Sequence, residues 1–367
     1  MKINNKILSL STALLICAQL LTGCAKHENN SVQTGASTTA VNTGSGSAQT
    51  DSGVPDDTRA PQEQVNFEAK LENYKLNNPN ADENTVKLYN YLCECYGNVM
   101  ISCQQESTWK GSPDYEMDYI KEKTGRLPAM RGLDFMNDDF DGVVQRSKEW
   151  HEKGGIVTIC WHTGVEGKGY QESLNDNPDF DKLLTEGTDE YNKMTANWDK
   201  AAKALAELRD AGVPVIWRPF HEFDGEWFWW GKGGAENFKK LWILMYEKFT
   251  NEYNLTNLIW ILGYSGSVKD GWYPGDEYCD IIGSDSYDND VNARGFLKLE
   301  ELTDAPKPLA YHECGNLPPV RNFVDRGTLW SWFMVWHTDH IIGNDVRNLK
   351  DFYNSDKVIT LDEVNIR

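Results

Sequence analysis

Eight short apolar runs, separated by stretches with helical patterns, follow one another from about residue 85 onward. Each run has the length of a single strand, and the eight are Val99–Ser102, Ala129–Asp134, Ile156–Trp161, Val215–Phe220, Leu258–Leu262, Ile281–Asp285, Pro308–Glu313 and Ser331–Trp336. Strands that alternate with helices pair in parallel, because each helix returns the chain to the same end of the sheet. Eight such units predict a closed (β/α)8 TIM barrel.

The segments between the runs have the composition of helices, as in Asp139–Lys153, Trp198–Ala211 and Glu236–Tyr253. The second is rich in Ala, Leu, Lys and Glu, which are good helix formers. A doubly wound open sheet is the alternative fold, and it predicts a Gly-rich phosphate-binding loop after an early strand. The sequence has no such loop, so it favours the barrel.

The first 24 residues have the pattern of an export signal. Lys2 and Lys6 provide the positive start, and an apolar run extends from Ile7 to Leu21. The run ends at Leu-Thr-Gly-Cys (21–24), which resembles a bacterial lipoprotein processing box in which Cys24 is acylated. The alternative is an ordinary secretory signal with a chance cysteine. We expect an exported protein that is anchored to the cell membrane through a lipid on Cys24, with its catalytic domain at the cell surface.

Residues 25–64 consist mainly of Ser, Thr, Gly, Asn, Gln and Asp, with almost no large apolar side chain. Such a composition cannot offset the entropy lost on folding, so this segment is expected to be a disordered linker. Residues 65–367 are then the folded domain.

The net charge of −20 argues against nucleic acid as a ligand, because like charges repel, but it does not disfavour a neutral ligand. The 14 Trp residues suit sugar rings, whose C–H faces stack on indole, although about half should serve packing. The six Cys residues after Cys24 show no zinc-ligand spacing, and no disulfide framework is expected. We expect a monomer that meets the membrane only through its lipid anchor.

Polar or aromatic residues stand at the ends of seven predicted strands. In a barrel these ends meet on one face, where active sites are built. A single charged strand end would be an ordinary loop, whereas seven describe a polar cavity. The residues are Gln104, Gln105, Arg131, Asp134, Trp161, His162, Arg218, His221, Glu222, Asp285, Tyr287, Glu313, Trp336 and His337.

Two of the strand ends carry a glutamate, Glu222 after the fourth strand and Glu313 at the seventh. Hydrolysis of a glycosidic bond needs two carboxyl groups, one to protonate the leaving oxygen and one to attack the sugar or activate water. A separation of about 5–5.5 Å predicts retention, and about 6.5–9.5 Å predicts inversion. One such Glu alone would be a salt-bridged rim residue. The pair at facing strand ends favours catalysis.

The neighbours of the two glutamates predict different protonation states. Phe220, Trp227 and Phe228 should desolvate Glu222 and raise its pKa, so that it serves as the acid. Donors such as Tyr287 or Arg218 should keep the second carboxylate ionised.

Three neighbouring polar residues have different expected roles. His221 is expected to be functional, since a buried histidine otherwise needs its own hydrogen-bond network. His312 should face away from Glu313 by strand alternation and have a structural role. For Arg218, bracing of the barrel and contact with substrate are both open. Outer sugar subsites are one interpretation of the loop residues Trp109 and Trp272.

The segment Arg-Pro-Phe-His-Glu (218–222), followed by Gly-Glu-Trp-Phe-Trp-Trp (225–230), resembles the signature of glycoside hydrolase family 26. Supporting matches cover most of the chain from about 90 to 340. They are Trp161-His162, Asp285-Ser286-Tyr287, Glu313-Cys314-Gly315 and Phe333–Trp336. The resemblance implies a retaining enzyme of the (β/α)8 clan with catalytic Glu residues at strands four and seven, most commonly an endo-β-1,4-mannanase.

Carried over residue by residue, the resemblance implies Glu222 as acid/base and Glu313 as nucleophile. It implies His221 as a partner of the acid or the sugar, Tyr287 as a donor to the nucleophile and Trp227 as the floor of the cleavage point. The full expected substrate-binding set is His162, His221, Trp227, Tyr287, Trp336, Arg218 and Trp161. No metal or other cofactor is expected, because two carboxyl groups suffice for the chemistry.

The sequence departs from the family pattern at Phe223-Asp224, at Thr163-Gly164 and at His337. These positions leave the glutamate pair intact, but they bear on which sugar hydroxyls are accepted. The expected substrate is β-1,4-mannan or a related neutral plant polysaccharide, with β-1,3-1,4-glucan and β-1,3-xylan as alternatives within the family. A non-catalytic surface glycan-binding lipoprotein is the alternative from another class. A transport-type binding protein would need two lobes, which the strand spacing does not suggest.

Overall fold

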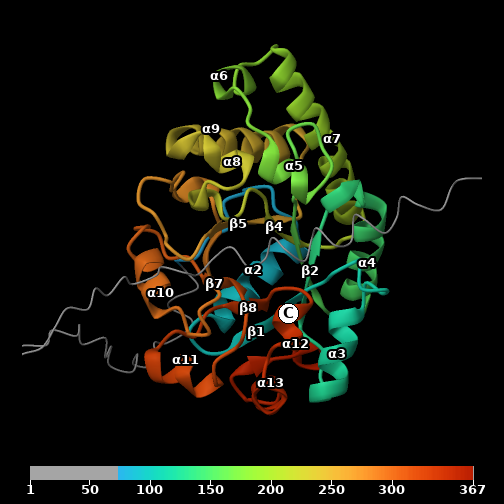
Figure 1. Cartoon of the computed structure of the whole chain (residues 1–367), viewed down its shortest axis with the longest axis vertical. Helices are drawn as coiled ribbons and strands as arrows, with labels where there is room; N and C mark the ends of the chain where they lie inside the picture. Colours follow the sequence, from blue (N-terminus) through green and yellow to red (C-terminus); the bar gives the residue numbers. More distant parts are fainter. Residues whose placement is uncertain (1–72, 367) are drawn as a thin grey trace, which may run out of the picture. The chain divides into compact units, whose positions relative to one another are not determined.

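A computed structural model describes residues 73–366 of the chain. The predicted signal peptide, Cys24 and the linker 25–64 lie outside the described residues. Within them, all eight predicted strands are present and form a closed parallel barrel, which confirms the predicted fold (Figure 1). The ring closes because β1 pairs with both β2 and β8. The strands are β1 (Met100–Gln105), β2 (Met130–Asp134), β3 (Ile156–Cys160), β4 (Val215–Arg218), β5 (Leu258–Tyr264), β6 (Ile281–Ser286), β7 (Leu309–Cys314) and β8 (Trp332–Val335).

Helices surround this ring, and the three predicted helical segments are all present. They differ from prediction mainly at their ends: α7 begins at Asp189, well before Trp198, because the Thr188 side chain caps it by accepting the Tyr191 N–H. The helices are α2 (Glu83–Cys95), α3 (Tyr115–Thr124), α4 (Phe140–Glu152), α5 (Tyr170–Asn175), α6 (Phe180–Leu183), α7 (Asp189–Asp210), α8 (Trp229–Lys232), α9 (Gly234–Glu247), α10 (Ala293–Glu300), α11 (Val320–Arg326), α12 (Asp339–Ile342) and α13 (Val346–Tyr353).

Two features depart from a regular (β/α)8 pattern. The connection between β5 and β6, residues 265–280, contains only the 3₁₀ turn η4 (Asp276–Tyr278) in place of an α-helix. A short ninth strand, β9 (Val358–Ile359), pairs in parallel with β1 outside the ring.

The barrel interior is apolar at its N-terminal end, where α2 closes it. Figure 1 shows α2 in the middle of the ring of strands. Its buried face packs against inward-pointing side chains that include Ile101, Ile156, Ile216 and Ile281. Because burying an isoleucine is worth about 1.5–3 kcal/mol, this plug and the larger layer between strands and outer helices supply the main stabilisation.

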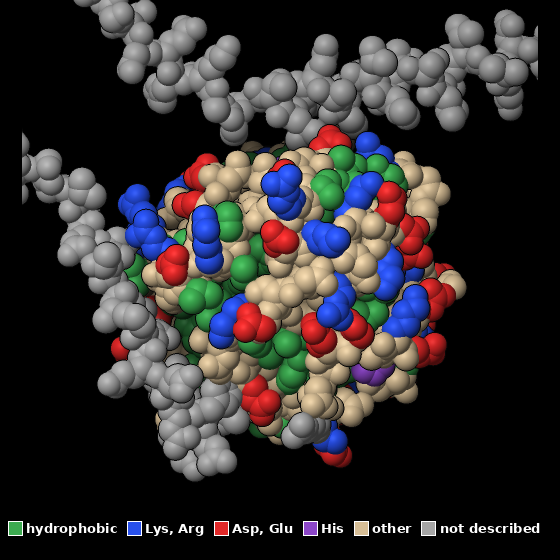
Figure 2. All heavy atoms as spheres, turned by 90° about the horizontal axis from the view of Figure 1, so that it is seen from below, with side chains coloured by type: hydrophobic (Ala, Val, Ile, Leu, Met, Phe, Trp, Pro, Cys, Tyr) green, Lys and Arg blue, Asp and Glu red, His purple; other side chains and the backbone are tan. Residues whose placement is uncertain are grey.

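The outer surface carries charges of both signs. Figure 2 shows acidic and basic side chains interspersed over the face seen from below in Figure 1. The six cysteines within the described residues are buried free thiols. None of the helices in residues 73–366 combines the length and the apolar character needed to cross a membrane.

Candidate active site

Glycines create space for large polar side chains in the C-terminal half of the barrel. A Cβ atom at Gly132 would lie 2.4 Å from Oε1 of Gln105. One at Gly263 would lie 2.5 Å from Nε2 of His312, and one at Gly283 would lie 2.7 Å from Cβ of His312. These three positions therefore exclude larger residues, because polar side chains fill the space that a Cβ would take.

Arg218 occupies the centre of this polar layer and is fully buried. Its Nη1 donates to Oε1 of Glu313 at 3.1 Å and lies 2.9 Å from Nε2 of His312. Its Nη2 donates to Oε1 of Gln105 at 3.1 Å. The other oxygen of Glu313, Oε2, accepts from the Tyr287 hydroxyl at 3.0 Å. Donors thus hold both oxygens of Glu313 at the end of β7.

A bulge in β7 explains how two consecutive residues reach this layer. Tyr311 and Cys314 lie three positions apart, whereas their partners in β6 and in β8 lie two positions apart. The extra residue interrupts the strand alternation, so His312 and Glu313 both contact Arg218. The prediction that His312 faces away from Glu313 is therefore wrong, because it assumed an uninterrupted strand.

The hydrogen bonds of His312 fix its tautomer. An arginine can only donate, so Nε2 of His312 accepts from Arg218. Its Nδ1 then carries the proton and donates to Oδ1 of Asp285 at 2.6 Å. Burial, followed by the charge of Arg218, lowers the pKa of His312 to about 3, so the ring is neutral. His312 links Arg218 to Asp285 and supports the layer under Glu313.

Glu222 follows β4 in a strained backbone segment. Both Phe220 (φ 50°) and Glu222 (φ 53°) have left-handed backbone angles, which are uncommon for these residues. The Glu222 N–H donates to the carbonyl of Gly263 at 2.8 Å, which ties the segment to β5. Strain of this kind persists only where surrounding contacts enforce it, and here it sets the direction of the acid side chain.

The surroundings of Glu222 favour its protonated form. Burial raises its pKa well above the usual value, and the charges of Asp285 and Glu313 raise it further. Oε2 of Glu222 accepts from Nε1 of Trp227 at 3.0 Å, which opposes the increase only in part. The environments of Glu222 and Glu313 therefore differ in the way predicted from their neighbours, with one carboxyl desolvated and the other held by donors.

A pair of histidines lies between these groups and β2. Nδ1 of His162 is 2.5 Å from Oδ2 of Asp134, and its Nε2 is 3.1 Å from Nε2 of His221. Burial lowers the pKa of His162, but the charge and hydrogen bond of Asp134 outweigh it, so the net shift is upward. Burial and the neighbouring His162 charge lower the pKa of His221 well below its usual value. The geometry suits a protonated His162 that donates to a neutral His221, whose Nε2 lies 3.9 Å from Glu313.

Exposed aromatic side chains surround the site. Trp227 and Tyr287, two of the predicted ligand contacts, are exposed, and Trp336 is half-buried with its ring 6.1 Å from that of His162. Tyr170, at the start of α5, is also exposed and lies 5.3 Å from the His162 ring. Sequence reasoning missed Tyr170, since it stands in a long β3–β4 connection without a motif.

Two of the predicted aromatic contacts lie elsewhere. Trp161 alternates with the inward-facing His162 and is buried against Phe135 and Phe140 in the layer under the helices. Trp272 is buried and packs on Phe223. We therefore leave both residues out of the proposed site.

Sequence reasoning recognised Asp134, Gln105 and Asp285 as strand-end residues but assigned them no role. Their roles follow from their partners: Asp134 holds His162, Gln105 accepts from Arg218, and Asp285 accepts from His312. Only their position at strand ends signalled them in the sequence.

Among residues 73–366, two groups have the residue types of metal ligands, namely Asp134 with Cys160 and His162, and Asp285 with His312 and Glu313. In both groups the histidine Nδ1 is already hydrogen-bonded to the aspartate. Burial raises the pKa of Cys160 well above its usual value, so it stays a thiol rather than a thiolate ligand.

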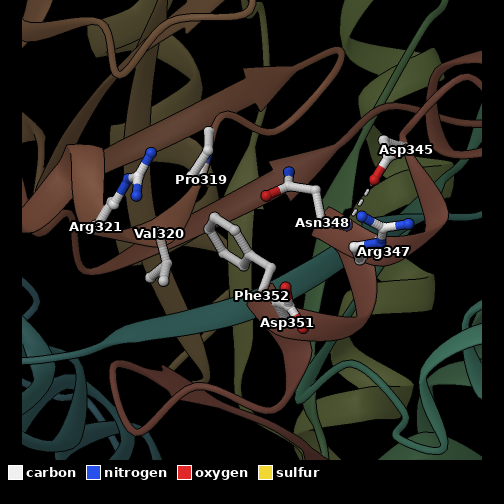
Figure 3. A pocket seen from close by; sticks show the side chains of 8 residues that line it. All are labelled: Pro319, Val320, Arg321, Asp345, Arg347, Asn348, Asp351 and Phe352. Carbon is white, nitrogen blue, oxygen red and sulfur yellow. Dashed lines mark hydrogen bonds between the residues drawn. The ribbon is translucent and has the colours of Figure 1, made fainter.

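A recess of about 370 Å³ lies outside this site, between α11 and α13 (Figure 3). Its lining includes two arginines and two aspartates around Phe352 and Val320. Figure 3 shows Arg321 and Arg347 on opposite sides of the recess, so they do not converge on one anionic group. The recess contains none of the residues at the barrel mouth.

The fold and the site thus define a (β/α)8 protein with two glutamates at the ends of β4 and β7, of which Glu222 has a raised pKa and Glu313 accepts from Arg218 and Tyr287. Residues 77–363 match Glycosyl hydrolase family 26, and the chain belongs to that family. It is 34% identical over 319 residues to a mannan endo-1,4-beta-mannosidase of Thermothelomyces thermophilus. This alignment covers 80% of this chain and 64% of that protein.

Two solved structures also resemble this chain. A ruminal GH26 endo-beta-1,4-mannanase is 32% identical with a TM-score of 0.76, and the match covers 82% of this chain and 72% of that one. The second structure is a beta-mannanase from a symbiotic protist of the termite Reticulitermes speratus, complexed with gluco-manno-oligosaccharide. It is 31% identical with a TM-score of 0.73, and the match covers 80% of this chain and 98% of that one. The chain spans less than two thirds of the length of the first curated relatives that it matches.

Proposed function

We propose that this protein is a retaining endo-β-1,4-mannanase in which Glu222 is the acid/base and Glu313 the nucleophile. The observation that carries the proposal is the contrast between the two carboxyl groups. Burial and neighbouring charges keep Glu222 protonated, whereas Arg218 and Tyr287 donate to both oxygens of Glu313. A double displacement at a glycosidic bond needs one group of each kind.

In the first step, an oxygen of Glu313 attacks C1 of the bound sugar while Glu222 gives its proton to the departing glycosidic oxygen. The C1–O bond breaks and a covalent glycosyl-enzyme forms. As negative charge leaves Glu313, Arg218 and Tyr287 stay in place as donors to its oxygens. Trp227 keeps the acid oriented through its indole N–H.

In the second step, Glu222 is a carboxylate and takes a proton from water, and the water oxygen attacks C1. The bond to Glu313 breaks and its carboxylate is restored, so two inversions give net retention. His221, which accepts from His162 through Nε2, stays neutral and adds no second positive charge beside Glu313.

The names of the relatives support β-mannan as the substrate. Several are mannan endo-1,4-beta-mannosidases, and the sequences align over most of the barrel. The exposed Trp227 and Tyr287 suit a polysaccharide that lies across an open mouth.

The test is a hydrolysis panel on β-mannan, mixed-linkage β-glucan and β-1,3-xylan, with the anomeric form of the first product followed by NMR. We expect hydrolysis of β-mannan with β-anomeric products. Initial α-anomers would contradict retention, and activity confined to another polysaccharide would contradict the substrate. A non-catalytic glycan-binding protein would bind mannan without releasing reducing ends.

We also propose that the protein is exported and lipid-anchored through Cys24, on the support of the sequence pattern alone. Metabolic labelling with a fatty acid in a bacterial host should label the unaltered chain. Cys24→Ala should lose the label and release the protein from the membrane fraction. Equal labelling of both chains would contradict the proposal.

A further inference from the structure

Asp224 is a buried carboxylate two residues after the catalytic acid, and the proposed mechanism does not use it. It lies in the 3₁₀ turn η2 (Phe223–Gly225), which directly follows Glu222. Its side chain accepts hydrogen bonds from the connection between β5 and β6, in which the turn η4 replaces an α-helix. A buried carboxylate with backbone partners fixes the chain around it, because its removal would leave those partners unpaired.

Three donors of this connection bind the two carboxylate oxygens of Asp224. The Ser265 N–H donates to Oδ1 at 2.7 Å, and the Lys269 N–H donates to Oδ2 at 3.1 Å. The Ser267 hydroxyl also donates to Oδ2, at 3.4 Å. Ser265 directly follows β5, so the first of these bonds joins the turn to the end of a barrel strand. Asp224 therefore holds η2 against the end of β5.

The same strand end also holds the backbone of the catalytic acid. The Glu222 N–H donates to the carbonyl of Gly263, which lies two residues before Ser265. Glu222 and Glu226 both have left-handed backbone angles, with φ of 53° and 64°, so strained residues flank the turn on both sides. Such a segment keeps its shape only where its surroundings enforce it, and Asp224 supplies the buried hydrogen bonds at its centre.

The connection that binds Asp224 is itself held in a strained conformation. Val268 has a φ of 43°, which a β-branched residue rarely adopts, and its side chain is buried. Its carbonyl accepts from Nζ of Lys298 in α10 at 3.3 Å. The next residue, Lys269, donates its backbone N–H to Asp224. Two irregular segments therefore meet at this carboxylate, and the contact between them fixes the conformation of both.

The turn is connected to the acid side chain through the ring of Trp227. A Cβ atom on Gly225 would overlap Cζ3 and Cη2 of Trp227, so the indole ring lies directly against the backbone of the turn. Nε1 of the same indole donates to Oε2 of Glu222 at 3.0 Å. A displacement of η2 would therefore move the indole, and the indole would move the carboxyl group that must face the glycosidic oxygen.

We propose that Asp224 is a positioning residue for the catalytic acid: it holds η2 against β5, so that Trp227 directs Glu222 toward the glycosidic oxygen. Asp224 touches neither the substrate nor the reacting atoms, since it is fully buried. The inference rests on the proposed function and adds to it a residue that affects proton transfer rather than the nucleophile. Loss of Asp224 should therefore slow cleavage most where the leaving group needs a proton.

The test compares two substrates that differ in their leaving group, β-mannan and an aryl β-mannobioside with a dinitrophenyl group. The constant to compare is kcat/KM, because it reports the steps up to the release of the first product. For Asp224→Ala, kcat/KM on β-mannan should fall about 10- to 100-fold, a part of the 10²–10⁴-fold that a general acid contributes. On the dinitrophenyl substrate, whose leaving group departs without a proton, it should fall less than about threefold.

Two further variants separate the hydrogen bonds of Asp224 from the contact with the indole. Asp224→Asn keeps one acceptor oxygen but presents an NH₂ group to the remaining donors, so its loss on β-mannan should be smaller than that of Asp224→Ala. Gly225→Ala keeps the carboxylate and displaces the Trp227 ring, so it should show the same difference between the two substrates. These two variants provide the test if Asp224→Ala does not fold.

Two matched controls distinguish positioning of the acid from a general loss of structure. Asp280→Ala removes another buried aspartate, which accepts two backbone N–H groups at 2.7 and 2.8 Å and precedes β6 at the opposite end of the barrel. It should lower the unfolding free energy without changing the ratio of the two kcat/KM values. Lys269→Ala removes an exposed ion pair with Glu226 but keeps the N–H that binds Asp224, so both rates should stay unaltered.

An equal loss on both substrates for the Asp224 and Gly225 variants, or no loss on either, would overturn the positioning role and leave the proposed function intact. A loss for Lys269→Ala as large as that for Asp224→Ala would also overturn it, because the exposed ion pair would then hold the turn. If the unaltered protein hydrolyses neither substrate, the proposed function fails and the role of Asp224 fails with it.

Discussion

The two halves of the barrel interior have opposite chemistry, although the same strands build both. At the N-terminal end the inward positions are Ile101, Ile156, Ile216 and Ile281, which pack on α2. Towards the C-terminal end β1, β4 and β6 present Gln105, Arg218 and Asp285, and hydrogen bonds join these side chains to one another and to His312 on β7. On β4 the change takes a single inward step, from Ile216 to Arg218.

This difference shows how one short strand serves two purposes. The apolar half gains free energy from burial, whereas the polar half places buried charges that are tolerated only because each has a partner. Substitutions in the first half should therefore alter stability with little effect on turnover, and substitutions in the second should alter turnover most.

The largest effect is expected from the glutamates themselves. Glu313→Gln should reduce kcat by several powers of ten, since no other carboxylate can form the covalent intermediate. Glu222→Gln should cost about 10²–10⁴-fold on mannan but much less on a substrate whose aryl leaving group needs no protonation. Steady-state rates on both substrates check this, and equal losses for Glu222→Gln on the two would contradict its role as the acid.

Removing Arg218 should lower both the stability of the fold and the catalytic rate. Arg218→Met leaves Glu313 buried without its charged partner, which typically costs about 3–5 kcal/mol of unfolding free energy, and misplaces the nucleophile. Arg218→Lys should not restore activity, because one ammonium cannot reproduce the planar fork that reaches Gln105, His312 and Glu313. Denaturant unfolding and kcat measure the two effects, and an active lysine variant would contradict the proposed geometry.

Ile216→Ala is the corresponding change in the apolar half. It should lower the unfolding free energy by about 2–5 kcal/mol through the cavity it leaves, while kcat of the folded protein stays near its original value. Urea unfolding and rates well below the transition temperature provide the measurement. A large fall in kcat would show that the two halves are not separable.

Gly263→Ala tests the boundary between the halves. Its Cβ would approach Nε2 of His312 to 2.5 Å, so the imidazole must shift, at a cost of about 1–3 kcal/mol. Because His312 supports Arg218, kcat should fall as well. Unchanged stability together with unchanged kcat would mean that the layer is looser than its contacts indicate.

The smallest effect concerns pH. The Trp227 N–H donates to Glu222 and so lowers the pKa of that carboxyl. Trp227→Phe removes this donor, so the pKa should rise and the acid should stay protonated to higher pH. The alkaline limb of kcat/KM against pH should move upward, by about one unit at most. A shift to lower pH would contradict the assignment of Glu222 to that limb.

The barrel could be predicted from the sequence because its strands are apolar and well separated. The eight runs located every strand of the ring, and polar residues at their ends located the mouth. The start of α7 was missed because the cap at Thr188 lies well before the helical pattern that signalled the helix.

The site was only partly predictable. Glu222, Glu313, Arg218 and Tyr287 come together as the strand positions suggested. The orientation of His312 was not predictable, because a bulge depends on pairing with both neighbouring strands and leaves no mark in composition. Trp161 was placed at the site by its neighbour His162, although alternation puts the two on opposite sides of β3.

The bulge in β7 also limits how this strand can change. Losing one residue there would restore a regular pleat, and either the imidazole or the carboxylate would then leave the mouth of the barrel. No choice of amino acids at the remaining positions could return both. For β7, the number of residues is therefore as restrictive as their identity, and a deletion should be as damaging as replacing Glu313 itself.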